Sequence, residues 1–125
     1  MRKGISTTND VQDATTSLMK DVDAVFVPTD NTVASTMTMI GELSVEYKVP
    51  VIGGSTDMVD AGGLLTYGTN YEALGRQTAK IAIKIIEGAD PAEVAVEYPE
   101  TVNLHVNEEM AKKLGIDVSE LSVDE

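Results

Sequence analysis

Residues 23–31 read Asp-Ala-Val-Phe-Val-Pro-Thr-Asp-Asn, and this stretch decides the fold. The apolar run over 24–27 predicts a short strand that ends at Pro28. Its nearly continuous apolar character favours burial on both faces, as is typical of strands in parallel α/β sheets. From Asn31 to about residue 47, apolar residues recur every three or four positions, which predicts an amphipathic helix packed on the sheet.

The same alternation of strand and helix extends outward in both directions. Short apolar runs predict further strands, and helical periodicity with stop signals predicts further helices. The expected strands lie at 4–6, 49–52, 64–67 and 102–106, and the expected helices at about 10–20, 71–87 and between Asn107 and Gly115. A short turn or helix is expected at about 57–61. Because strands that alternate with helices indicate βαβ units, we expect an α/β fold with a parallel sheet flanked by helices.

The composition limits the classes to which the chain can belong. Its 125 residues fit one globular domain, and the absence of cysteine excludes disulfides, iron–sulfur clusters and thiolate zinc sites. The formal net charge is −12, and residues 87–125 hold eleven acidic residues against two lysines, so we expect no nucleic-acid partner. No run approaches the roughly 18 apolar residues of a membrane span, and no signal-peptide core follows Met1.

The sequence carries no pattern typical of an enzyme. The loop at 53–57 lacks the second glycine of a nucleophile elbow, and no phosphate-loop or dinucleotide-binding glycine pattern occurs. The single histidine, His105, lies inside an expected strand, which favours a structural role. We therefore predict no catalytic residue, no metal site and no cofactor.

Three polar loops follow the expected strands and are the candidate binding segments. They are 6–9, 28–31 and 53–57, each rich in hydroxyl, amide or carboxylate groups. Ligands of parallel α/β sheets lie beyond the carboxyl ends of the strands, and helix N-termini attract anions. With Asp30 as a partner for a cation, this edge suits a zwitterion such as an amino acid. The alternative is that the same residues serve only as helix caps and turns.

Several motifs follow one another in an order that resembles a known family. They are Asn9-Asp10-Val11, the stretch 23–33, Val49-Pro50-Val51-Ile52, Gly62 to Tyr71 with Leu74-Gly75, the Gly88-x-x-Pro91 break, and Asn107-x-x-x-Ala111-x-x-Leu114-Gly115-Ile116. The chain resembles the carboxyl-terminal part of the ABC transporter substrate-binding proteins, whose members include tryptophan- and tyrosine-binding lipoproteins. The resemblance implies a partial type I periplasmic-binding-protein fold, which closes two lobes on a small ligand and catalyses no reaction.

The resemblance also implies a domain organisation and partners. Residues 1–66 look like the α/β core of the second lobe, 67–95 like the hinge crossover and a long helix that belongs to the first lobe, and 96–125 like the return strand and last helix of the second lobe. Family members are longer, with a signal and a lipobox cysteine, so we expect a truncated fragment of an extracytoplasmic lipoprotein that serves an ABC permease. The face of the long helix formed by Leu74, Thr78, Ile81 and Ile85 would then be uncovered, which predicts a homodimer.

Site residues follow from the same resemblance. Thr29, Asp30 and Asn31 are similar to the ligand-contacting loop of the second lobe, in which Asp30 would pair with an ammonium group. The neighbouring candidates are Thr7, Thr8, Ser55 and Thr56, and Tyr67 and Tyr71 flank the hinge, where a ring would stack on an aromatic amino acid or would simply pack locally. The alternative function is a free-standing flavodoxin-like domain with an interaction or signalling role.

Overall fold

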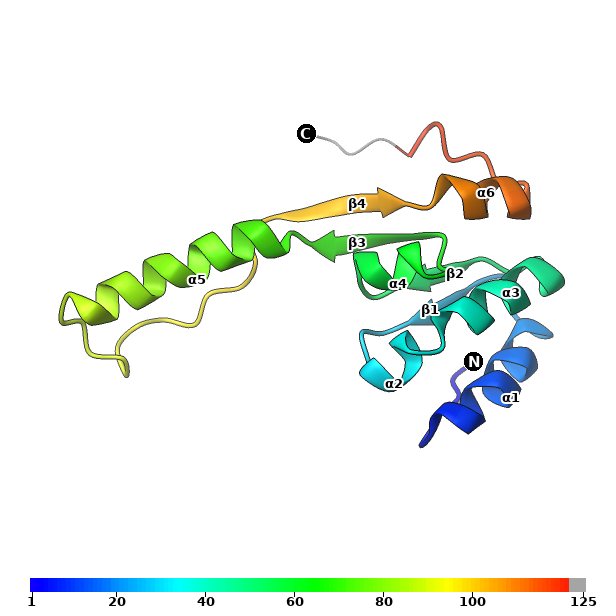
Figure 1. The fold of residues 1–125 in the computed structure, drawn as a ribbon, viewed down its shortest axis with the longest axis horizontal. Coiled ribbons are helices and arrows are strands. Elements are labelled where there is room, and N and C mark those ends of the chain that lie inside the picture. Colours follow the sequence, from blue (N-terminus) through cyan, green and yellow to red (C-terminus); the bar gives the residue numbers. More distant parts are fainter. Residues whose placement is uncertain (122–125) are drawn as a thin grey trace. The chain divides into compact units, whose positions relative to one another are not determined.

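The computed structural model describes residues 1–121 as an alternation of helices and strands (Figure 1). The elements are α1 (Thr8–Met19), β1 (Val25–Val27), α2 (Asn31–Ala34), α3 (Met37–Tyr47), β2 (Val51–Gly53), α4 (Thr56–Asp60), β3 (Leu65–Thr69), α5 (Tyr71–Ile86), β4 (Val102–Val106) and α6 (Glu108–Leu114). Among these helices, none combines the length and apolar character that a bilayer crossing requires.

The chain forms two compact units. The first consists of Met1–Gly68 together with the residues from Leu104 onward, and the second consists of Thr69–Asn103. The predicted divisions after residues 66 and 95 differ from these bounds, which fall within β3 and β4. The assignment of the segments to two lobes of a binding protein stays a prediction.

The sheet has four strands in the order β1-β2-β3-β4, which confirms the predicted α/β class. β1 and β2 are parallel, with Val25 opposite Val51 and Val27 opposite Gly53, and β2 and β3 are parallel with Ile52 opposite Leu65. The arrows of β3 and β4 point in opposite directions in Figure 1. The last strand is therefore an antiparallel addition to a sheet whose other strands are parallel, as is common in α/β folds.

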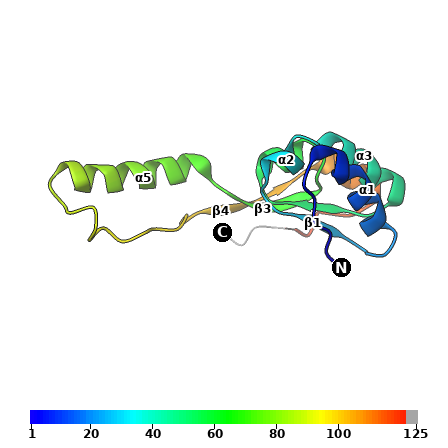
Figure 2. The same cartoon turned by 90° about the horizontal axis from the view of Figure 1, so that it is seen from below.

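Helices α1, α2 and α3 lie on one side of the strands of the first unit (Figure 2). The buried core joins this helical layer to the inward-facing residues of β1 and β2. Its members are Val11, Met19, Val25, Val27, Met37, Ile40, Leu43, Val49, Val51 and Met58. A second cluster, Leu64, Met110 and Ala111, attaches α6 to the start of β3.

The expectation that the first strand is buried on both faces is wrong. Val25 and Val27 are buried, but the Phe26 side chain between them is 67% exposed. Side chains alternate across a strand, so Phe26 points to the face opposite Val25 and Val27. An apolar run therefore does not distinguish a strand covered on both sides from one covered on a single side.

The helix predicted from Asn31 to about residue 47 is in fact two helices, α2 and α3. At the junction, the Ser35 hydroxyl donates to the Thr32 carbonyl at 2.8 Å and the Thr36 hydroxyl donates to the Val33 carbonyl at 2.8 Å. Such side-chain bonds compete with the regular helical ladder, which explains the break. Residues 4–6, expected as a strand, have no strand conformation, although Ile5 packs against the core.

Contacts from β4 and α6 hold the end of the chain to the first unit. The Nε2 atom of His105 lies 2.6 Å from Oδ1 of Asp60, at the end of α4. The Asn107 side chain donates to the Val59 carbonyl at 3.0 Å and accepts the Met110 N–H at 3.0 Å, and its backbone N–H donates to Leu64. His105 thus makes a structural contact, as expected.

The second unit consists of α5 and the segment that returns beside it. Gln77 is buried, and its side-chain amide donates to Glu97 and to the Tyr98 carbonyl, both at 2.9 Å. The hydrogen bond from Gln77, assisted by the charge of Lys84, lowers the pKa of Glu97. Asn70 caps the start of α5 by accepting the Ala73 N–H at 3.0 Å.

Candidate functional site

The loops that follow β1 and β2 are in direct contact at the carboxyl edge of the sheet. The Thr29 hydroxyl donates a hydrogen bond of 2.9 Å to the carbonyl of Gly54, which lies 25 positions later in the chain. A Cβ atom on Gly54 would collide with the backbone N–H and hydroxyl of Thr29. The two loops therefore approach as closely as backbone allows, and only glycine fits between them.

The loop after β2 is also in contact with β3. A Cβ atom on Gly68, the fourth residue of β3, would lie 2.8 Å from the Thr56 methyl carbon. Thr56 is half-buried and begins α4, whereas Thr29 is exposed. A row of residues at the ends of three strands thus runs along one sheet edge from Thr29 through Gly54 and Thr56 to Gly68, as expected for parallel strands that end at a common edge.

Asp30 caps α2. Its Oδ1 atom accepts the Val33 N–H at 3.1 Å, and the side chain is exposed. A carboxylate has two oxygens, so capping uses one of them and leaves the second able to accept from a ligand. Asn31 begins α2, which has only four residues, so the dipole available to hold an anion at this start is smaller than a long helix from Asn31 would supply.

Thr7 and Thr8 lie at the start of α1, where Thr7 serves as a cap. The carboxylate of Asp10 accepts the backbone N–H groups of Ser6 and Thr7 at 3.1 and 2.9 Å and the Thr7 hydroxyl at 3.0 Å. These bonds lower the pKa of Asp10, and the bond from the Ser6 N–H has the largest effect. The Thr7 hydroxyl is thus engaged within its own turn, whereas Thr8 is exposed in the first turn.

The remaining candidates are Ser55, Tyr67 and Tyr71. Ser55 is the N-cap residue of α4, but its hydroxyl makes no capping hydrogen bond, so it is able to serve a ligand. Tyr67 and Tyr71 are 64% and 60% exposed, so neither residue is buried by packing within the described structure. Tyr67 lies on β3 in the first unit and Tyr71 begins α5 in the second, so the structure groups only Tyr67 with the loops of the first unit.

A cavity of about 260 Å³ begins beside the candidate site. Asp30 contributes to its lining together with Val33 and Ile40. Within residues 1–121, no three acidic or histidine side chains converge closely enough to hold a metal ion. Hydroxyls, backbone groups and one carboxylate suit hydrogen bonding to a small polar ligand, and they supply no activated nucleophile.

Sequence reasoning placed Gly54 in a candidate binding loop but missed its contact with Thr29. Gly54 brings the loops after β1 and β2 together, and its carbonyl receives the Thr29 hydroxyl. The signal was present in the paired Gly53-Gly54 at the end of a predicted strand, where glycine often marks a close backbone approach.

Comparison with known proteins identifies what the chain is similar to. The family model described as ABC transporter substrate binding protein matches residues 2–124. A curated relative, the tyrosine-binding protein of Clostridioides difficile strain R20291, is 34% identical over 124 residues, which cover 99% of this chain and 35% of the relative. The chain therefore spans about a third of the length of that relative.

Solved structures agree with the family match. The ligand-free, open structure of CD0873, a substrate-binding protein with adhesive properties from Clostridium difficile, is 38% identical with a TM-score of 0.77; the match covers 94% of this chain and 40% of that one. An ABC domain from Streptococcus pneumoniae in complex with L-Trp is 32% identical with a TM-score of 0.80 and the same two coverages. These relatives are binding proteins, which confirms the prediction of a non-enzymatic function and disfavours a flavodoxin-like signalling domain.

Proposed function

Because the chain belongs to the ABC transporter substrate-binding protein family, we propose that its carboxyl edge forms one wall of a site for an aromatic amino acid, which an ABC importer takes up. The observation that carries this proposal is the row of contacts from Thr29 through Gly54 to Thr56, which holds polar groups of two loops together. Two of the relatives bear names that state tyrosine or L-Trp as the ligand. On the basis of these two names, we propose an aromatic amino acid as the ligand of this chain.

Each end of the zwitterion has a partner in the proposed site. Asp30 accepts from the ligand ammonium through the carboxylate oxygen that does not cap α2. The ligand carboxylate receives hydrogen bonds from the hydroxyls of Ser55 and Thr56 and from the free N–H groups at the start of α4, while Thr29 and Asn31 add polar contacts. The exposed ring of Tyr67 stacks on the aromatic side chain.

The wider role is proposed on the family relationship. The first unit acts as the second lobe of a two-lobed binding protein, and α5 acts as part of the other lobe. The binding protein works outside the cytoplasm, anchored as a lipoprotein, and delivers its ligand to an ABC permease. In the relatives, the matched region is 35–40% of a longer chain, so a second wall from another region would complete the enclosure that tight binding needs.

A second proposal concerns self-association through α5. Of the predicted apolar face, Leu74 and Ile81 are half-buried, whereas Thr78 and Ile85 remain exposed. Ile83 and Ile86, three positions apart, add an exposed apolar pair, with 52% and 82% of their surface exposed. A second copy of the chain covers these isoleucines in a homodimer, because contiguous exposed apolar groups favour association.

The ligand proposal is tested by titrating free tryptophan with the protein. The chain contains four tyrosines and no tryptophan, so excitation at a wavelength that tryptophan absorbs and tyrosine does not restricts the emission to the ligand. We expect a saturable blue shift and increased anisotropy, reversed by excess tyrosine but not by excess glycine, which lacks the ring. Unchanged tryptophan emission at saturating protein, together with no heat of binding for tyrosine, would contradict the proposal.

A further inference from the structure

The contact between His105 and Asp60 joins β4 to the end of the helix that begins beside the candidate site. Nε2 of His105 lies 2.6 Å from Oδ1 of Asp60, which lies 45 positions earlier in the chain. Asp60 is the last residue of α4, and the site candidates Ser55 and Thr56 precede it by about one turn. A contact that fixes the end of this five-residue helix therefore also fixes its beginning.

Tight packing connects α4 to the loops of the candidate site. Met58 and Val59 of α4 are buried, and a Cβ atom on Gly53 would lie 3.3 Å from the first and 3.1 Å from the second. Gly53 ends β2 and is followed by Gly54, whose carbonyl accepts the Thr29 hydroxyl. Because α4 is in van der Waals contact with this backbone, a displacement of the helix displaces the loop as well.

The carboxylate of Asp60 lies where a helix favours positive charge. Free carbonyl groups at the end of a helix carry partial negative charge, and the last turn of α4 contains no basic residue. Among residues 1–121, His105 is the one basic side chain within ion-pair distance of Asp60. A neutral imidazole offers the carboxylate a hydrogen bond alone, whereas a protonated imidazole adds a positive charge. Since histidine side chains change charge between pH 5 and 8, the strength of this contact varies in that range.

Other titratable groups lie on the elements around this contact, and β4 itself carries none besides His105. They are Asp57 on α4, Tyr67 on β3, Glu42 on α3, and the ion pairs Glu108–Lys112 and Glu109–Lys113 on α6. A hollow of about 470 Å³ is lined by Asp60 together with Glu42, Glu109 and Lys113. Lys113 lies 2.7 Å from Glu109, so this lysine does not replace His105 as the partner of Asp60.

We propose that His105 is a positioning residue for the ligand-binding loops, which holds the end of α4 through Asp60 most firmly when its ring is protonated. The ion pair forms in mildly acidic solution and is reduced to a hydrogen bond as the pH rises toward 8. Ser55 and Thr56 are then held less firmly for the ligand. The effect on ligand affinity rests on the proposed function, whereas the anchoring of α4 is a property of the chain and is measured without ligand.

The first experiment therefore measures anchoring in the absence of ligand. The chain contains one histidine, so His105→Gln removes all histidine titration while it keeps a neutral hydrogen-bond donor. Amide NMR spectra are compared at about pH 6 and about pH 8, on either side of the range in which histidine changes charge most. We expect the amide signals of residues 53–61 to shift between the two pH values in the unmodified chain. They should stay in place in His105→Gln and in Asp60→Asn, which keeps an oxygen acceptor but has no charge.

The second experiment measures tryptophan affinity by the fluorescence titration at the same two pH values. The side chains of His105 and Asp60 are 36% and 66% exposed, so the expected effect is that of a surface ion pair. We expect the unmodified chain to bind tryptophan about two- to fivefold more tightly at the lower pH, and His105→Gln and Asp60→Asn to bind equally at both.

The outcomes separate the failure of this proposal from that of the proposed function. Amide signals of residues 53–61 that ignore pH, or that respond to it equally in Asp60→Asn, would overturn the anchoring of α4. Tryptophan binding of equal strength at both pH values in the unmodified chain would overturn the positioning role of His105. Amide shifts as expected without tryptophan binding at either pH would support the anchoring and contradict the proposed function.

Discussion

The hydroxyl of Thr29 donates a hydrogen bond of 2.9 Å to the carbonyl of Gly54, and this bond joins the loops that follow two adjacent parallel strands. Both loops then begin helices, α2 at Asn31 and α4 at Thr56. The bond therefore sets the spacing between two helix starts that are proposed to contact one ligand.

Replacement of Thr29 by valine should separate the two loops. Thr29→Val removes the donor and leaves the Gly54 carbonyl without it, so we expect the free energy of unfolding to fall by about 0.5–1.5 kcal/mol. Tryptophan binding should weaken as well, because the spacing of the polar groups changes. Urea unfolding measures the first effect and the fluorescence titration measures the second. Thr29→Ser keeps the hydroxyl and should behave like the unmodified chain; equal losses in both variants would contradict the role of the bond.

Replacement of Gly54 and of Gly75 by alanine should change the free energy of unfolding in opposite directions. Gly54→Ala places a methyl group against the Thr29 backbone, so we expect a loss of about 1–3 kcal/mol in the free energy of unfolding. Gly75 lies within α5 with open space around it, so Gly75→Ala should stabilise the helix by about 0.5–1 kcal/mol. Urea unfolding of both variants measures the contrast. A stable Gly54→Ala variant would show that the loops are able to move apart at little cost.

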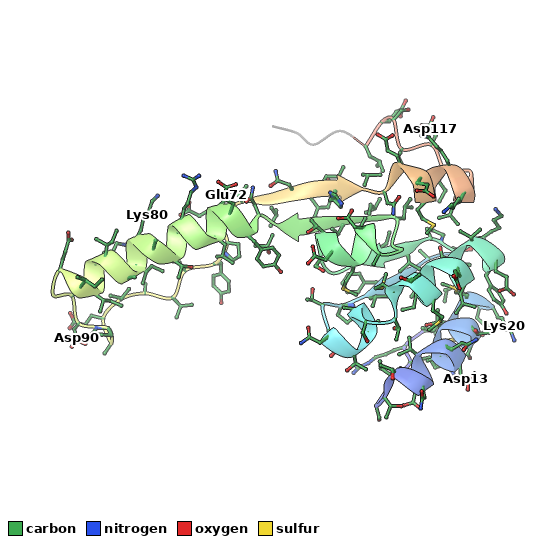
Figure 3. The ribbon with its side chains drawn as sticks, in the orientation of Figure 1. Asp13, Lys20, Glu72, Lys80, Asp90 and Asp117 are labelled. Carbon is green, nitrogen blue, oxygen red and sulfur yellow. The ribbon has the colours of Figure 1, made fainter. Side chains whose placement is uncertain are left out.

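The charge of Asp30 should matter for binding more than for folding. Asp30→Asn keeps a side-chain oxygen to accept the Val33 N–H but removes the negative charge, so the α2 cap should survive. We expect tryptophan affinity to fall more than tenfold, or about 1.4 kcal/mol or more, in the fluorescence titration. Asp13 projects outward from α1 (Figure 3), so Asp13→Asn removes the same charge away from the loops and serves as the matched control. If the unmodified chain, Asp30→Asn and Asp13→Asn bind tryptophan with equal affinity, Asp30 does not contact the ligand.

The cap of α1 should make stability depend on pH in the acidic range. The N–H groups of Ser6 and Thr7 lower the pKa of Asp10 from its ordinary value of 3.8. Because the pKa of Asp10 is lower in the folded chain than in the unfolded chain, its hydrogen bonds add fully to the free energy of unfolding above the unfolded-state pKa. This contribution is lost as the pH falls through the folded-state pKa. The stability difference between the unmodified chain and Asp10→Ala should therefore be largest near neutral pH and should shrink below about pH 3.8. Urea midpoints across this range measure it, and a difference independent of pH would contradict the assignment.

The isoleucines of α5 should control self-association. At protein concentrations on the order of tens of micromolar, we expect sedimentation velocity to detect a dimer, and Ile83→Ser with Ile86→Ser to convert it to monomer because apolar burial is lost. Lys80→Ser changes an exposed position of the same helix (Figure 3) and should leave the dimer intact. A monomeric unmodified chain at these concentrations would contradict the proposed homodimer.

Much of the fold and part of the candidate site were predictable from local pattern. Strand β4 and helix α6 begin and end where the sequence predicts, because Asn107 is a strong cap and Gly115 adopts the left-handed conformation that ends a helix. The break between α2 and α3 was missed, since apolar periodicity continues across Ser35 and Thr36 and hides their hydrogen bonds to backbone carbonyls. The loops near Thr29 and Thr56 were predictable because parallel strands share a carboxyl edge.

By itself, the sequence determined the order and class of the elements and the polar character of three loops, because periodicity and caps are local properties of the chain. Tertiary structure alone decided the exposure of Phe26, the bond between Thr29 and Gly54, and the pairing of His105 with Asp60. These features join residues far apart in sequence or depend on which face of a sheet other elements cover. They exist only once the strands have found their register and the helices have packed, so no local pattern records them.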